Sequence, residues 1–139
     1  MVRDTDTPEV GDTDLHASRL CNDEDAAFAI GVLVPGCEWE YVPAPRDDRR
    51  WCVWFLDRAS RSWARFDHQP GTRRWPVHQF GPRRLFDEVT AAYRQWDHAG
   101  RPPATHWRFT LTPHQQDVEL AATTASTPPS LHAFVAEPN

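Results

Sequence analysis

The sequence predicts an α+β fold, in which an antiparallel meander sheet carries one main helix, at about residues 81–99, on one of its faces. Two patterns support this prediction. Apolar residues recur at helical spacing after Phe80, and short runs rich in aromatic and β-branched residues lie on both sides of that stretch, separated by turn residues. The chain has 139 residues, which is enough for one modest core.

The main helix has the clearest pattern. Its apolar residues share one helical face: Leu85, Val89, Ala92, Tyr93 and Trp96. We expect Gly81 to act as the N-cap, with Pro82 at the first helical position and Phe80 packed on Leu85. Gly100 is expected to end the helix, because Pro102 cannot continue it.

The strands are predicted from alternating or continuous apolar runs. We expect a buried strand at Phe28–Val34 and a half-buried strand at Glu38–Val42. A three-stranded meander is expected at Trp51–Asp57, Ser62–Asp67 and Arg73–Gln79, and a C-terminal hairpin at His106–Thr112 and Val118–Leu120. Pro76 has no N–H to donate, so its strand is expected at an edge of the sheet, or with that N–H side facing water.

Composition divides the chain into three parts. Residues 1–25 are expected to form an acidic, mostly disordered leader, with a helical turn near Asp23–Ala27. Residues 26–122 form the α+β domain, and residues 123–139 a loose C-terminal tail. The leader contains eight acidic residues and two arginines, whereas residues 46–101 contain twelve arginines and seven acidic residues. The leader is thus either a solvated tail or a competitor of an acidic partner for the arginine-rich surface.

Several kinds of chemistry are excluded by residues that are missing. The chain has no lysine, which excludes a Schiff-base lysine and a phosphate-loop lysine. Its three cysteines lack C-x-x-C spacing, and its six glycines are isolated from one another, so neither a thiolate zinc site nor a nucleotide loop is indicated. We therefore expect no cofactor and no metal. The absence of a signal peptide and of any long apolar run predicts a cytoplasmic protein that does not enter a membrane.

An arginine cluster interleaved with tryptophans is the remaining feature that suggests a function. Arginine and tryptophan are favoured where proteins bind peptides and other proteins. The predicted peptide- or partner-binding residues are Arg73, Arg74, Arg83, Arg84, Trp63, Trp75 and Asp67. The net charge of −5 and the absence of lysine argue against nucleic acid as the partner. The alternative is that these arginines only solvate one face and pair with nearby carboxylates.

The run from Leu56 to Leu120 also resembles a known family. It is similar to the C-terminal extension of isoaspartyl-methyltransferase-like enzymes that modify lanthipeptides and ATP-grasp-modified peptides. The most specific matching piece is Gly81-Pro-Arg-Arg-Leu-Phe-Asp-Glu-Val89, and further pieces are Ser60–Ala64, Ala92–Trp96 and Arg108–Pro113. Nothing in the chain corresponds to the family's S-adenosylmethionine-binding domain. The resemblance therefore implies the accessory domain standing alone, with a precursor peptide or a biosynthetic enzyme as its partner.

Three hypotheses follow for the function. The first is a non-catalytic accessory module that binds a precursor peptide or a partner enzyme in peptide natural-product maturation. The second is a small enzyme with a Trp-lined pocket, acting through Asp67, His68 or His78. In that reading Cys52 is not the nucleophile, because it lies among bulky apolar residues and is expected to be an inert core thiol. The third is the detached structural subunit of a split methyltransferase; whether the chain forms a homodimer is left open.

Overall fold

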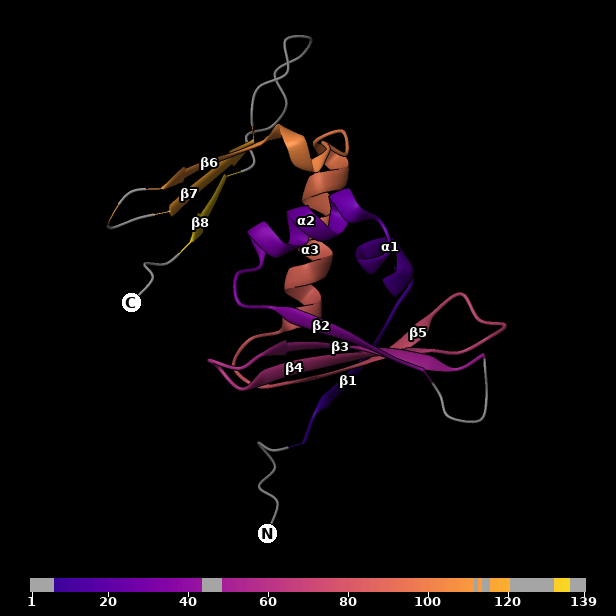
Figure 1. Cartoon of the computed structure of the whole chain (residues 1–139). Helices are drawn as coiled ribbons and strands as arrows, with labels where there is room; N and C mark the ends of the chain where they lie inside the picture. The colour runs from indigo at the N-terminus through magenta and orange to yellow at the C-terminus, as the bar shows by residue number, and fades with distance from the viewer. Residues whose placement is uncertain (1–6, 44–48, 112, 114–115, 121–131, 136–139) are drawn as a thin grey trace.

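A computed structural model describes residues 7–43, 49–111, 113, 116–120 and 132–135. A five-stranded antiparallel sheet has the strand order β1-β5-β4-β3-β2. Three helices lie on one side of this sheet, and a second sheet of three strands lies beside the helices (Figure 1). The predicted α+β class is confirmed. The elements of the large sheet and its helices are β1 (Glu9–Thr13), α1 (Ala17–Cys21), α2 (Glu24–Leu33), β2 (Glu38–Pro43), β3 (Trp51–Asp57), β4 (Ser62–His68), β5 (Trp75–Phe80) and α3 (Leu85–His98).

The core forms where α2 and α3 meet the inner face of the large sheet. Alternate residues of β3 and β4 are buried there, as the period of two in a strand requires. Phe55 of β3, Phe66 of β4 and Leu85 of α3 are all fully buried. Each strand therefore has one face in the core and another that points away from the helices.

The predicted helix is present, but it begins later than expected. Its apolar stripe from Leu85 to Trp96 is buried, as predicted. The helix starts at Leu85, not next to Gly81, because Gly81 has a φ of 101° and belongs to a turn outside it. A Cβ atom at Gly81 would lie 2.6 Å from the Cα atom of Ser62, so this turn packs directly on β4. The expected packing of Phe80 on Leu85 is replaced by stacking of Phe80 on Trp63. Gly100, with a φ of 89°, follows the helix as predicted.

The predicted buried strand over Phe28–Val34 is wrong, because this segment belongs to helix α2. The side chain of Asp23 caps the helix by accepting from the amides of Asp25 and Ala26, in line with the helical turn expected near Asp23–Ala27. The helix is apolar on most sides because it lies between α3 and the second sheet. A helix buried on several sides and a buried strand produce the same continuous apolar run.

The predicted disorder of the leader is wrong for residues 9–13 and 17–21. Strand β1 pairs with β5 from Glu9 to Thr13, and α1 buries Ala17 and Leu20 in the core. Strand β5 is therefore an inner strand, and the edge position predicted from Pro76 is wrong. The ladder between β4 and β5 begins at Val77. Pro76, which has no N–H to donate, therefore lies outside that ladder.

The second sheet contains β6 (Trp107–Leu111), β7 (Gln116–Leu120) and β8 (His132–Val135), in that order. A short 3₁₀ helix (Ala104–His106) leads into it. The β6–β7 hairpin confirms the prediction for this segment. Strand β8 pairs with β7 inside the segment predicted to be a loose tail, so that prediction is wrong for residues 132–135.

Candidate binding surface

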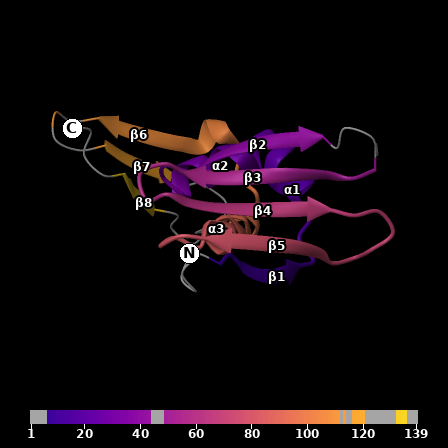
Figure 2. The same ribbon diagram turned by 90° about the horizontal axis from the view of Figure 1, so that it is seen from below.

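The large sheet has one face that no described element covers. Figure 2 shows this face from below, with the strands in front of the helices. Residues that pair across strands share a face, so the registers place alternate residues of β3, β4 and β5 on this side. We call the following set of seven residues the open face: Trp54, Leu56, Trp63, Arg65, Asp67, His78 and Phe80.

Three aromatic rings form a continuous row on the open face. The ring of Trp63 stacks on Phe80 at 5.9 Å between centroids and meets Trp54 at 5.3 Å. The guanidinium of Arg65 lies 5.4 Å from the ring of Trp54. All four side chains are only partly buried. A partner that covered them would bury more apolar surface without any unfolding of the sheet.

The charged groups of the open face engage one another. Nε of Arg65 lies 3.0 Å from the Asp67 carboxylate, and Nδ1 of His78 lies 3.3 Å from the same carboxylate. A guanidinium nitrogen of Arg65 also lies 3.3 Å from that Nδ1. These contacts hold the Asp67 carboxylate between Arg65 of the same strand, β4, and His78 of the neighbouring strand, β5. The three polar groups therefore form a fixed, mixed-charge patch beside the aromatic row.

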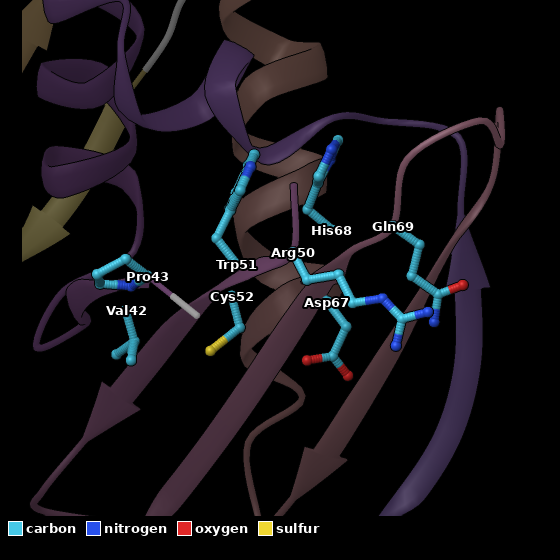
Figure 3. A pocket seen from close by; sticks show the side chains of 8 residues that line it. All are labelled: Val42, Pro43, Arg50, Trp51, Cys52, Asp67, His68 and Gln69. Atoms are coloured by element: carbon cyan, nitrogen blue, oxygen red, sulfur yellow. The ribbon is translucent and has the colours of Figure 1, made fainter. Parts of the chain in front are cut away.

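A cavity of about 330 Å³ lies at one end of strands β2, β3 and β4. Figure 3 shows that Trp51 and His68 point toward the helices from its lining, whereas Cys52 and Asp67 point to the other side of the sheet. Cys52 is half-buried and faces outward, so the expectation of a core thiol is wrong for its position. Burial nevertheless raises the pKa of its thiol, which disfavours the nucleophilic thiolate.

A pair of histidines occupies the helix side of the same end of the sheet. Nδ1 of His16 accepts from the amide N–H of Ser18, and Nε2 of His16 lies 3.0 Å from Nδ1 of His68. His68 stacks on Trp51 at 4.6 Å, and Trp75 meets His16 at 4.8 Å. Burial lowers the pKa of both imidazoles. Sequence reasoning missed this pair, because His16 lies in the segment that was predicted to be disordered.

The four predicted arginines have different surroundings. Arg83 is held by Glu88 at 2.8 Å, by Asp57 at 3.1 Å and by the carbonyl oxygen of Pro35 at 2.9 Å. Arg74 binds Asp12 of β1 through two nitrogens, at 2.7 and 3.1 Å.

The other two arginines, like Arg74, are exposed. Arg84 pairs with Glu9 of β1 and with Asp87. Arg73 is exposed in the β4–β5 connection. The acidic leader therefore occupies two of the four arginines within the molecule itself.

The structure separates the seven predicted site residues. Trp63 and Asp67 lie on the open face, whereas Trp75 lies on the helix side with the histidine pair. Sequence reasoning did not select Trp54 and Phe80, and it named His78 only for the alternative of an enzyme. The alternation of residues within β3 and β4 could have indicated part of this face, because it places Trp54 and Trp63 on the side opposite the buried residues.

Comparison of the chain with protein-family models, with curated proteins and with solved structures found no match.

Within the described ranges, no three His, Cys, Asp or Glu side chains are placed to hold a metal ion. The helices in this part of the chain are all too short or too polar to cross a membrane.

Proposed function

We propose that the protein is a cytoplasmic, non-catalytic module that binds a polypeptide on its open face. One observation carries the proposal: the ring of Trp63 meets those of Trp54 and Phe80 on a sheet face that no described element covers. The resemblance of residues 56–120 to a methyltransferase extension suggests the kind of partner. We propose that the partner is a precursor peptide or an enzyme of peptide natural-product maturation.

The composition of the open face favours a polypeptide over other ligands. Partly exposed tryptophans beside an arginine are typical of the residues that contribute most to protein–protein binding. Nucleic acid needs an excess of positive charge, whereas Arg65 is neutralised by Asp67 and the chain has a net charge of −5. A polypeptide supplies apolar side chains for the aromatic row and polar groups for the Asp67 patch.

Two other functions remain as alternatives. A catalytic chain could cover the same face, in which case the protein is the structural subunit of a split methyltransferase. An enzyme could use the cavity in Figure 3, which Asp67 and His68 line. The raised pKa of Cys52 and the contacts of Asp67 with Arg65 and His78 favour binding over catalysis.

A peptide-display library tests the proposal. The library is selected on the wild-type protein and on the variant Trp54→Ser/Trp63→Ser, and affinities of the selected peptides are measured by calorimetry. We expect the double variant to bind the selected peptides at least about 30-fold more weakly, because each tryptophan contributes on the order of 1–2 kcal/mol. Arg94→Ser, at an exposed position of α3, is the matched control and should bind as wild type.

The result that overturns the proposal is equal binding by the double variant and the control, with both folded by circular dichroism. Co-purification of the protein with a co-expressed methyltransferase chain, lost in the double variant, would favour the structural subunit instead. Turnover of a peptide by the purified chain alone would favour the enzyme.

A further inference from the structure

Strand β2 is one edge of the large sheet. It pairs with β3 from Glu38 to Pro43, and no described strand lies on its other side. Five of its six residues are exposed, and only Trp39 is partly buried. An edge strand presents unpaired N–H and C=O groups along its free side, and these groups are able to pair with another extended chain.

The side chains of β2 make this edge unusual. The described residues include three exposed large apolar side chains: Val10, Tyr41 and Val42. Two of the three are neighbours on β2, where Tyr41 is 57% exposed and Val42 is 37% exposed. Neighbours in a strand point to opposite faces, so each face of the sheet has one exposed apolar side chain at this edge.

Each of these side chains also borders a cavity. Tyr41 lines a cavity of about 340 Å³ with Trp51, Val53 and residues of α1, on the helix side of the sheet. Val42 lines the cavity of about 330 Å³ that also contains Cys52 and Asp67 (Figure 3). A strand added to β2 would send alternate side chains to the two faces, and therefore toward these two cavities.

We propose that β2 accepts an extended segment of a partner polypeptide as a sixth strand of the large sheet. The inference rests on the proposed polypeptide-binding function and names the way in which the partner is held. Backbone hydrogen bonds to β2 supply affinity, and the cavities beside Tyr41 and Val42 select apolar side chains at successive positions.

The charge of β2 specifies the partner further. Glu38 and Glu40 lie on the same face as Val42, two residues apart along the strand. Glu38 has an exposed contact with Arg58 at 3.5 Å, whereas Glu40 has no ion-pair partner in the part of the chain that the structure describes. An arginine or lysine opposite Glu40 would form a cross-strand ion pair. The preferred segment therefore has a basic side chain opposite Glu40 and apolar side chains at the two positions that reach the cavities.

A second copy of the chain fits this edge less well. In a two-fold antiparallel pairing centred on Glu40, the two Glu40 carboxylates would face each other and repel. If the two-fold pairing were centred on Tyr41, it would extend only from Trp39 to Pro43 of each copy, and Pro43 has no N–H to donate. The opposite edge is also less suitable, because Glu9 and Asp12 of β1 are already bound to arginines.

Synthetic peptides of about nine residues test the inference. One has valine opposite Tyr41 and opposite Val42 and arginine opposite Glu40, a second has glutamate in place of that arginine, and a third repeats the first with every second backbone amide methylated. Affinity is measured by calorimetry, and amide hydrogen exchange of residues 38–43 is measured with and without peptide. We expect the valine–arginine peptide to slow exchange in β2, and the other two to bind at least about tenfold more weakly, through lost charge pairing or lost hydrogen bonds.

The variant Glu40→Arg supplies the matched control on the protein side. It should weaken binding of the valine–arginine peptide and strengthen binding of the valine–glutamate peptide. Equal binding of the methylated peptide, or unchanged exchange in β2 when the peptide is bound, would overturn the inference. Either result would leave the proposed function in place if binding still required Trp54 and Trp63, so the two failures are distinguishable.

Discussion

Arg83 and Arg84 are neighbours in the sequence but have different surroundings. The side chain of Arg83 is 25% exposed and joins Asp57 of β3, Glu88 of α3 and the carbonyl oxygen of Pro35 before β2. Arg84 is half exposed, and its partners Glu9 and Asp87 are exposed as well. The hydroxyl of Ser60, and then Arg83, lower the pKa of the Asp57 carboxyl group. Arg83 therefore links three parts of the fold, whereas the contacts of Arg84 lie at the surface.

Replacement of each arginine by methionine tests this difference. Arg83→Met leaves the nearly buried carboxylate of Asp57 without its cation, so we expect the free energy of unfolding to fall by about 2 kcal/mol. Arg84→Met removes only exposed ion pairs, and we expect a clearly smaller loss. Urea unfolding of both variants measures the difference, and equal losses would contradict it.

Two short elements near the N-terminus depend on contacts with distant parts of the chain. Helix α1 has five residues, too few to be stable alone, and His16 caps it while contacting His68 of β4. Strand β1 buries only Thr13, and its acidic side chains bind Arg74 and Arg84. Both elements have the composition of a disordered segment, and both are ordered by the sheet.

The histidine pair predicts a pH dependence of stability. Burial lowers the pKa of His16 and His68, so at pH values between the folded and unfolded pKa the unfolded chain binds more protons. The free energy of unfolding should therefore decrease as pH falls from about 7 to about 5. In His68→Gln we expect a smaller decrease, whereas His98→Gln, at an exposed position of α3, should behave as wild type. Urea unfolding at several pH values checks this, and an unchanged slope in His68→Gln would refute it.

The attachment of β1 should depend on salt. Its ion pairs to Arg74 and Arg84 are exposed, and at about 1 M salt the screening length shortens to about 3 Å. We expect amide exchange in β1 to be faster at high salt than at low salt. Exchange in β3, which lies between two strands, should not change. Equal salt effects on both strands would show that the ion pairs do not hold β1.

At the scale of the whole molecule, the helices cover one face of the large sheet, and the small sheet lies beside them (Figure 2). The small sheet contacts α2 (Figure 1). Trp107 at the start of β6 is buried in the main core and lies 6.3 Å from Phe28 of α2, measured between ring centroids. This tryptophan therefore joins the small sheet to the core. The far side of the large sheet remains open for a partner.

Truncation of this tryptophan should release the small sheet before the large one. We expect Trp107→Ala to destabilise the protein by about 3 kcal/mol, because a buried indole is lost. Limited proteolysis should then cut within residues 104–120 earlier than within β3 or β4. Simultaneous cleavage of both regions would mean that the two sheets unfold as one unit.

The sequence by itself determined the elements whose pattern reflects a single buried face. These are the stripe of α3, the β3–β4 hairpin and the β6–β7 hairpin. For α3 and the β3–β4 hairpin, local periodicity was sufficient because each element buries one face and exposes the other more fully. For the candidate site, the same reasoning selected Trp63 and Asp67 but not Trp54 or Phe80.

Only the tertiary structure decided which residues act together. Helix α2 was mistaken for a strand because two different layers bury it and remove its periodicity. The carboxylate partners of the arginines lie up to 75 residues away in the chain, so no local pattern reveals these ion pairs. The face to which each tryptophan points follows from strand register, which contacts between distant segments set.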